Sequence, residues 1–292
     1  MKIGIIASDR KEWHVERLLK ELKGRGAEAY LLPVTSFRAA VGGDPRLTVK
    51  GHSVDDYDAV IVRRVPGGSA EQVFYRMDVL HRLEDSGVLV VNPALSIERT
   101  VDKYYTSALL EDAGIRTPRT VVTESFTEAM EAFEELGGDV VVKPLFGSLG
   151  MGITRVSDPD LAHRVFRALE MMRNVYYIQE FISHPGVDHR IFIIGGTIIA
   201  SMRRVAVGWK TNISGGGKAE PYTPSDDEAE LSLRAAERLG LIYTGVDIIV
   251  SDEGETYVVE LNSTPGWEGL QTVTDVDITG AVVSRVLSLL GR

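Results

Sequence analysis

Three oxygen-bearing side chains near the C-terminus are spaced so that they could bind a divalent cation together. Two β-branched runs flank an acidic turn, a pattern typical of a β-hairpin. If Ser251 pairs with Thr256 across this turn, two carboxylates lie directly opposite each other. These belong to Asp247 and Glu260, and Asn262 projects from the same face of its strand as Glu260. Carboxylate and amide oxygens suit Mg²⁺ or Mn²⁺ rather than zinc, so we predict a metal site here.

The alternative is that both carboxylates face solvent on an edge hairpin. Like charges directly opposite each other destabilise a strand pair, and Asp247 and Glu260 both have apolar neighbours in the sequence. An unpaired charge is costly in such surroundings, which favours a cation between the two. The hairpin alone does not identify a function.

A lysine and the glycine-rich segment that follows it could bind phosphate. A short apolar run ends at Lys143, and the next loop contains Gly147, Ser148, Gly150 and Gly152. Such a loop can lay backbone N–H groups along phosphates. It is not a P-loop, because Gly-Lys-Ser/Thr is absent. By itself the loop is equally compatible with an ordinary mobile hairpin.

Polar residues also interrupt the apolar run 176–182. Gln179 and Glu180 occupy its centre, where backbone groups and a carboxylate could meet the edge of an adenine; a hinge between domains is the alternative. Asp188 precedes the next predicted strand and could hold a ribose hydroxyl.

A basic, glycine-rich segment follows in an otherwise acidic chain. Arg203 and Arg204 end a predicted strand, Lys210 and Asn212 follow, and residues 214–218 read Ser-Gly-Gly-Gly-Lys. In a chain of net charge −10, this segment is the best candidate for neutralising a triphosphate. A solvated basic loop is the alternative, and the neighbouring acidic cluster favours anion binding.

Composition limits the classes of function. The 292 residues suffice for two or three packed units, and the content of 44% hydrophobic and 25% charged residues is that of an ordinary soluble protein. We expect a cytoplasmic protein, because no apolar run could span a membrane and no signal peptide precedes the first strand. The absence of cysteine excludes disulfides and thiolate metal sites. The negative net charge argues against non-specific nucleic-acid binding.

Alternating strands and helices are expected before residue 98, which predicts a small, mostly parallel α/β domain. The first strand leads into no G-x-G-x-x-G, so dinucleotide binding is unsupported. Residues 41–53 are rich in turn formers and predict a loop or a small hairpin. One helix is expected from Ser96 to Asp112. It carries Lys103, for which a solvated side chain is the ordinary expectation.

Together these motifs resemble the ATP-grasp fold, in its RimK/LysX-like branch. The resemblance implies an α/β protein with a Rossmann-like pre-ATP-grasp domain over 1–98. Two α+β subdomains of the ATP-grasp fold would follow, over 99–181 and 182–292. The loop reads Ser-Leu-Gly-Met rather than the commoner Thr-Gln-Gly-Ile, and Leu261 replaces a valine. The matching motifs, in the family's order, are Asp102-Lys103, Val142-Lys143-Pro144, the loop 147–152, Gln179-Glu180-Phe181-Ile182, Asp188-His189-Arg190, Arg203-Arg204, Asn212, Gly245-Val246-Asp247, Glu260-Leu261-Asn262-Ser263 and Pro265-Gly266.

The resemblance also implies roles for these residues in an ATP site. Lys103 and Lys143 would contact the phosphates, and the loop 147–152 would close over them. Asp188 would hold the ribose. Glu180 and the backbone near Ile182 would hold adenine, and Gln179 and Phe181 are further candidates for binding the cofactor. Two Mg²⁺ or Mn²⁺ ions would be bound by Asp247, Glu260 and Asn262, with Glu260 bridging. The catalytic candidates are Arg203, Lys210 and Asn212, with Arg203 on the transferring phosphoryl group or the tetrahedral intermediate.

Four further segments, 74–80, 121–125, 209–214 and 262–267, resemble archaeal ligases that add L-glutamate to the tail of tetrahydromethanopterin. The implied reaction joins a carboxylate of this small acceptor to the α-amino group of L-glutamate through an acylphosphate. A protein C-terminus, a carrier protein or another cofactor is the alternative acceptor. Outside enzymes, the alternative is a non-catalytic nucleotide-binding regulator, which would need neither the two lysines nor the metal candidates. The resemblance is also compatible with a homodimer.

Overall fold

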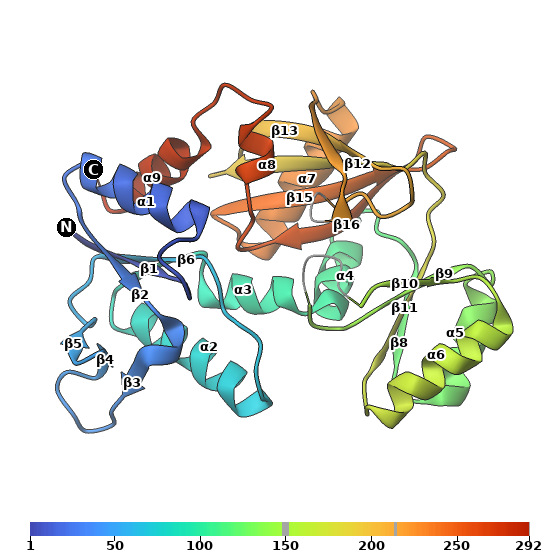
Figure 1. The fold of residues 1–292 in the computed structure, drawn as a ribbon, viewed down its shortest axis with the longest axis horizontal. Helices are drawn as coiled ribbons and strands as arrows, with labels where there is room; N and C mark the ends of the chain where they lie inside the picture. Colours follow the sequence, from blue (N-terminus) through green and yellow to red (C-terminus); the bar gives the residue numbers. More distant parts are fainter. Residues whose placement is uncertain (148–151, 213–214, 292) are drawn as a thin grey trace.

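The structure is a computed structural model that describes residues 1–147, 152–212 and 215–291. Three main β-sheets follow one another along the chain, with helices packed against them (Figure 1). None of the helices in this described part of the chain has the length and apolar character needed to cross a membrane.

The first sheet is parallel throughout, as the alternation of strands and helices predicts. Its elements are β1 (Lys2–Ile6), α1 (Trp13–Gly24), β2 (Glu28–Leu32), β6 (Ala59–Val62), α2 (Ala70–Asp85) and β7 (Leu89–Val91), in the strand order β2-β1-β6-β7. Neighbouring residues of β1 enter different cores. Ile3 and Ile5 share a core with Leu18 of α1, whereas Ile6 shares one with Leu80 of α2. The sheet is therefore covered on both faces.

The turn-rich stretch 41–53 belongs to a small antiparallel sheet, in agreement with the hairpin alternative. Its strands are β3 (Phe37–Ala39), β4 (Leu47–Val49) and β5 (His52–Ser53), and the short helix η1 (Val34–Ser36) precedes them. Leu47 and Val49 are buried in the core that also contains Leu80 of α2.

The single helix expected from Ser96 to Asp112 is wrong, because the structure has two helices there. These are α3 (Ala94–Val101) and α4 (Lys103–Asp112). Asp102 is extended between them and caps α4, since its Oδ1 accepts a hydrogen bond of 3.0 Å from the backbone N–H of Tyr105. This break places Lys103 at the first residue of α4.

The second sheet is antiparallel, and one of its faces is covered by two helices. Its elements are β8 (Thr120–Thr123), α5 (Phe126–Glu135), β9 (Val140–Lys143), β10 (Thr154–Val156), α6 (Pro159–Met171) and β11 (Tyr176–Glu180), in the order β10-β9-β11-β8. Tyr176 and Ile178 of β11 share a core with Phe133 of α5. Because side chains alternate along a strand, Tyr177 and Gln179 face away from these helices.

The third sheet is antiparallel as well, and helix α7 packs on one face. The elements are β12 (Val187–Ile194), β13 (Thr197–Val205), β14 (Lys218–Pro221), α7 (Asp226–Leu239), β15 (Tyr243–Val250) and β16 (Thr256–Asn262), in the order β14-β13-β12-β15-β16. Val246 and Ile248 of β15 share a core with Leu239 of α7. Asp247 therefore lies on the face opposite α7.

The hairpin of β15 and β16 pairs Asp247 with Glu260, as predicted, although the turn is not the predicted one. Val250, not Ser251, pairs with Thr256, so the turn is longer than expected. A bulge next to Asp247 shifts the register by one residue and restores the pairing of the carboxylates. Without this bulge, Glu260 would face the other side of the sheet.

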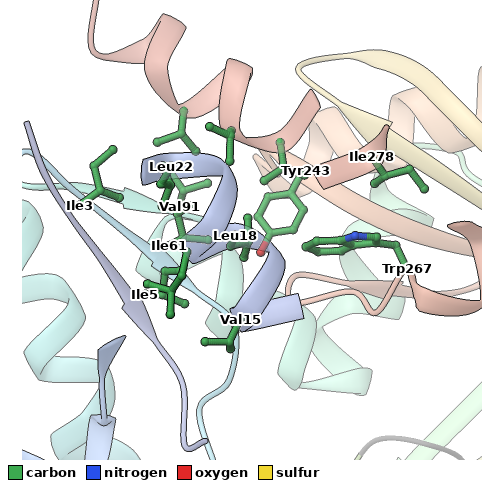
Figure 2. Packing of buried hydrophobic residues seen from close by; sticks show 14 of the residues in the cluster. Ile3, Ile5, Val15, Leu18, Leu22, Ile61, Val91, Tyr243, Trp267 and Ile278 are labelled. Carbon is green, nitrogen blue, oxygen red and sulfur yellow. The ribbon is translucent and has the colours of Figure 1, made fainter. Parts of the chain in front are cut away.

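The C-terminal segment packs back against the first domain. It contains the short helix α8 (Glu268–Gln271) and helix α9 (Ile278–Leu289). Figure 2 shows Tyr243, Trp267 and Ile278 beside side chains of β1 and α1, and all belong to one buried core. The first and third sheets thus share one core. The domain boundaries near residues 98 and 181 stay predictions.

One amide side chain ties the end of β7 to the third sheet. Asn92 is fully buried, and its Oδ1 accepts hydrogen bonds from the backbone N–H groups of Ile242 (2.7 Å) and Tyr243 (3.1 Å). Its Nδ2 donates to the backbone carbonyls of Tyr243 (2.7 Å) and Ser263 (2.6 Å). All four amide positions are therefore used for joining the two parts.

We predict that Asn92→Ala lowers the free energy of unfolding by about 3 kcal/mol or more, because it leaves buried backbone groups unpaired. Urea denaturation would measure the change. Asn174 is exposed and serves as the control. Asn174→Ala should change the free energy by less than about 0.5 kcal/mol. Equal, small changes in both variants would contradict the role of Asn92.

Candidate active site

A cavity of about 110 Å³ is lined by residues of both the second and the third sheet. The chain brings most of the predicted site residues to it from segments far apart in the sequence. The predicted residues that line the cavity are Lys143, Gln179, Glu180, Phe181, Ile182, Asp188, Lys210, Asn212, Asp247 and Glu260.

Lys143 ends strand β9 and points toward the polar residues of β11. Its Nζ donates a 2.5 Å hydrogen bond to Oε1 of Gln179. Burial lowers the pKa of Lys143 to about 8, although the nearby carboxylate of Glu260 opposes this shift. The side chain is thus a poorly solvated cation facing the cavity.

Lys103 adds a second cation from the start of α4. Its Nζ donates a 2.9 Å hydrogen bond to the backbone carbonyl of Gly147, at the beginning of the predicted phosphate loop. Burial lowers the pKa of Lys103, and Glu260 again opposes the shift. Gly152 has φ +76°, a conformation that favours glycine. Ser148 and Gly150 lie outside the described residues.

The two predicted metal-binding carboxylates differ in their surroundings. Burial and the neighbouring Asp247 carboxylate raise the pKa of Glu260, while the two lysines lower it less strongly. Burial also opposes ionisation of Asp247, but Arg190 and Arg204 overcome it and hold the pKa of that carboxyl below its usual range. Of the two carboxylates, Asp247 is therefore the one whose negative charge is balanced by neighbouring arginines.

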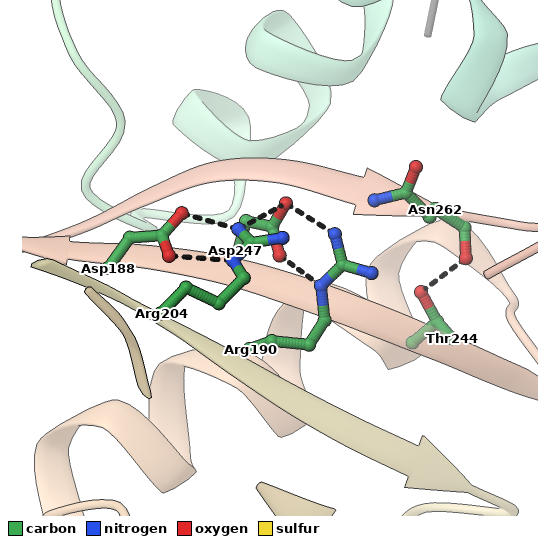
Figure 3. Close-up of polar contacts among 6 residues, drawn as sticks. All are labelled: Asp188, Arg190, Arg204, Thr244, Asp247 and Asn262. Atoms are coloured by element: carbon green, nitrogen blue, oxygen red, sulfur yellow. Dashed lines mark hydrogen bonds and ion pairs between the residues drawn. The ribbon is translucent and has the colours of Figure 1, made fainter. Parts of the chain in front are cut away.

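Figure 3 shows the ion pairs that surround Asp247. Arg190 donates to Asp247 through both Nε and Nη2, the latter at 2.7 Å. Nη2 of Arg204 lies 3.1 Å from Oδ2 of Asp247, and Arg204 also binds both carboxylate oxygens of Asp188. Asp188, expected to hold a ribose, is thus already paired with an arginine.

Arg190 is a site residue for which the sequence predicts no role, and Arg204 is predicted only as part of the basic segment that could neutralise a triphosphate. Both lie in quoted motifs, and the alternation of side chains along a strand could have identified them. Asp188 and Arg190 share one face of β12, and Arg204 is the cross-strand partner of Asp188.

The three catalytic candidates lie in different surroundings. Arg203 has a half-exposed side chain and pairs with Glu220 on β14 at 2.6 Å. As the neighbour of Arg204 on β13, it points to the opposite face of the sheet. Lys210 and Asn212 line the cavity, and Nζ of Lys210 donates a 2.6 Å hydrogen bond to the backbone carbonyl of Ile153.

The segment predicted to bind adenine forms one wall of the cavity. The carboxylate of Glu180 accepts a 2.7 Å hydrogen bond from the backbone N–H of Arg119. The ring of Phe181 lies 3.5 Å from the guanidinium carbon of Arg155 and 6.0 Å, edge-on, from the ring of Trp209. Trp209 also lines the cavity and was quoted only as part of a resembling segment.

The donor set fits a hard divalent cation. No group of three or more His, Cys, Asp and Glu residues suited to a metal occurs in the described ranges. The candidate set is instead two carboxylates and the amide of Asn262. Nδ2 of Asn262 is buried and has no partner in the described structure, so no hydrogen bond from its nitrogen fixes the amide. Arg190 and Arg204 use three of the roughly four lone pairs of the Asp247 carboxylate, which leaves one for a cation. A cation bound there would relieve the repulsion between Asp247 and Glu260.

Two family models match nearly the whole chain. A RimK PreATP-grasp domain matches residues 1–97, and a RimK-like ATP-grasp domain matches residues 100–286. The chain belongs to the RimK-like ATP-grasp family. This membership confirms the predicted fold class, a pre-ATP-grasp domain followed by an ATP-grasp fold.

Several relatives carry the names of glutamate ligases. The chain is 32% identical to the tetrahydromethanopterin:alpha-L-glutamate ligase of Methanosarcina acetivorans, over 92% of this chain and 93% of the relative. It is 34% identical to the ligase of the same name from Methanocaldococcus jannaschii, over 98% of both chains. It is also 34% identical to a probable alpha-L-glutamate ligase of Thioalkalivibrio sulfidiphilus, over 98% of this chain and 95% of the relative. The chain is therefore an ATP-grasp ligase, a class of enzyme that forms C–N bonds.

Solved structures share the fold at lower identity. The ATP-grasp ligase PsnB, complexed with minimal precursor, Mg and ADP, is 24% identical with a TM-score of 0.76, over 99% of this chain and 98% of that chain. The RimK domain protein of Sphaerobacter thermophilus is 22% identical with a TM-score of 0.78, over 98% and 100%. At these identities the likeness concerns the fold alone.

Adjacent arginines on β13 allow a matched test of the ion pairs. We predict that Arg204→Met lowers the free energy of unfolding by about 3 kcal/mol, because it leaves Asp188 buried without its partner. Arg203→Met removes a half-exposed pair and should cost less than about 1 kcal/mol. Urea denaturation of both variants measures the difference. Equal losses, or a larger loss at Arg203, would contradict the assignment of faces.

Proposed function

We propose that the chain uses ATP to join a carboxylate of a small acceptor to the α-amino group of L-glutamate. The observation that carries this proposal is the convergence of Lys103 and Lys143 on Glu260, the cross-strand partner of Asp247. Cations from two separate elements beside a candidate divalent-metal site suit a transferring phosphoryl group.

In the proposed reaction, an oxygen of the acceptor carboxylate attacks the γ-phosphorus of ATP. The bond from that phosphorus to the bridging oxygen then breaks. The products of this step are ADP and the acylphosphate of the acceptor. The amine nitrogen of L-glutamate then attacks the acyl carbon, the bond from carbon to the phosphate oxygen breaks, and the amine loses a proton. The protein mainly positions these groups and compensates their charge.

Residue roles follow the geometry of the cavity. Lys103, which contacts the carbonyl of Gly147, and Lys143 would bind the phosphates. Glu180 and the backbone near Ile182 meet the adenine. Arg204 already donates a hydrogen bond to each carboxylate oxygen of Asp188. Asp188 can therefore accept a hydrogen bond from a ribose hydroxyl only through its remaining lone pairs. Lys210 and Asn212 face the cavity as candidates for contact with the reacting groups.

Asp247, Glu260 and Asn262 would hold Mg²⁺ or Mn²⁺, proposed as two ions. Bound there, the ions would neutralise charge that develops on the phosphoryl oxygens. As the arginine that stabilises the transferring phosphoryl group we propose Arg204, which faces the cavity, in preference to Arg203. The side chain of Arg203 lies on the opposite face of the sheet.

We further propose the tail of tetrahydromethanopterin as the acceptor. This rests on the names of the relatives at 32% and 34% identity and on the resembling segments of the sequence. The test supplies ATP, Mg²⁺, L-glutamate and a panel of acceptors, and mass spectrometry follows the products. A gain of one glutamate on tetrahydromethanopterin is the expected result. A glutamate on a protein C-terminus, a carrier protein or another cofactor would keep the ligase reaction and reject the pterin.

We predict that Glu260→Gln lowers the rate of amide formation at least about 100-fold, because charge compensation in the site is lost. Release of ADP in the presence of both substrates measures the rate. Glu253 lies exposed in the turn of the same hairpin, so Glu253→Gln is the matched control and should retain normal turnover. Near-normal turnover of Glu260→Gln would contradict the assignment of Glu260 as a metal ligand.

A further inference from the structure

The side chain of Gln179 has no hydrogen-bond donor left for a nucleotide. It is 2% exposed, and its Oε1 accepts the 2.5 Å hydrogen bond from Lys143. Its Nε2 donates to the hydroxyls of Thr120 (2.9 Å) and Tyr177 (3.1 Å). An amide nitrogen carries two hydrogens, and both are used here. This arrangement argues against direct contact between the Gln179 side chain and a nucleotide, although Gln179 is among the residues predicted to bind the cofactor.

The hydrogen bonds continue from Gln179 to helix α4. The hydroxyl of Tyr177 lies 3.0 Å from the hydroxyl of Ser107. Tyr177 is buried, so this hydroxyl depends on protein partners. The chain of contacts therefore runs from Ser107 through Tyr177 and Gln179 to the ammonium group of Lys143.

The same helix also carries the other cation of the site. Lys103 and Ser107 are four residues apart in α4 and so lie on one face of the helix. Lys103 itself reaches the carbonyl of Gly147 at the start of the predicted phosphate loop. Helix α4 thus carries Lys103 itself. It also supports Lys143 through the side chains of Ser107, Tyr177 and Gln179.

We propose that Gln179 is a positioning residue that holds the ammonium group of Lys143 where it meets the phosphates of ATP. Tyr177 and Ser107 fix the orientation of its amide. An ammonium has three donors, and Gln179 takes one of them, which leaves two for phosphate oxygens. The proposal rests on the proposed function, because it requires Lys143 to bind phosphate.

The orientation of the Gln179 amide follows from its partners. Lys143 has donors only, so the amide must turn its oxygen toward the ammonium. The nitrogen then faces two hydroxyls, and a hydroxyl can accept a hydrogen bond while donating another. The hydroxyl of Tyr177 can accept a hydrogen bond from Gln179 and still form a hydrogen bond with the hydroxyl of Ser107. Every polar group in this buried chain thus has a partner, which is the condition for a rigid network.

The test measures calorimetric binding of a non-hydrolysable ATP analogue and of adenosine to the full-length chain. The variants are Gln179→Met, Lys143→Met and the double variant, because Met keeps the length of Gln without its hydrogen bonds. We expect Gln179→Met to weaken binding of the ATP analogue by about tenfold or more. Adenosine, which lacks phosphates, should bind within about twofold of the wild type. In the Lys143→Met background, Gln179→Met should cause no further loss.

Three results would overturn the proposal. Equal weakening of the ATP analogue and of adenosine would mean that Gln179 contacts the nucleoside. Full additivity in the double variant would mean that Gln179 acts independently of Lys143. Unchanged binding of the ATP analogue by Lys143→Met would reject the phosphate role of Lys143 itself. That last result is a failure of the proposed function and is distinguishable from the first two.

Tyr177→Phe provides a second, milder variant if Gln179→Met does not fold. It removes only the hydroxyl that orients the amide and keeps the buried ring. We expect it to weaken binding of the ATP analogue about threefold, the effect of one neutral hydrogen bond, and to have no effect in the Lys143→Met background. A loss of the same size in both backgrounds would contradict the proposed chain of contacts.

Discussion

The carboxylates of Asp247 and Glu260 lie opposite each other in a poorly solvated part of the third sheet, and the rest of the site compensates their repulsion. Asp247 is neutralised within its own sheet by Arg190 and Arg204. The pKa of Glu260 is lowered by Lys103 and Lys143, which come from other elements, and less by Arg190. Together these cations lower it less than burial and Asp247 raise it. Asp247 is therefore held as an ion by its own sheet, while Glu260 is the carboxylate that most needs a further cation.

The charged groups around the two carboxylates come from different parts of the fold. The third sheet supplies the carboxylates and their arginines, the second sheet supplies Lys143, and α4 supplies Lys103. Burial of Asn92 and the packing of Trp267 fix the first domain against the same third sheet. Lys143 and the two carboxylates line one cavity, and Lys103 interacts with Glu260, so no single element carries all of these groups. A ligase gains from this division, because binding of phosphates and metal between the elements would draw them together.

Much of the candidate site could be predicted because its residue types are unusual for their positions. A carboxylate in an apolar strand and a lysine before a glycine-rich loop are visible in the sequence without any structure. The partners of these residues were not visible, because they depend on the register of the strands. The expected pairing of Asp247 with Glu260 is correct, yet it arises from a longer turn and a bulge that cancel each other. The end of a helix at Asp102 was also missed, since capping by its side chain is a local contact that periodicity does not show.

The central claim is that the acceptor carboxylate attacks ATP and becomes an acylphosphate before the amide forms. The most direct measurement follows ¹⁸O from a labelled acceptor carboxylate through one turnover with ATP, Mg²⁺ and L-glutamate. The account predicts that the inorganic phosphate released carries one ¹⁸O atom, because the bond from the acyl carbon to that oxygen breaks when the amine attacks. Amide product accompanied by unlabelled phosphate would contradict it.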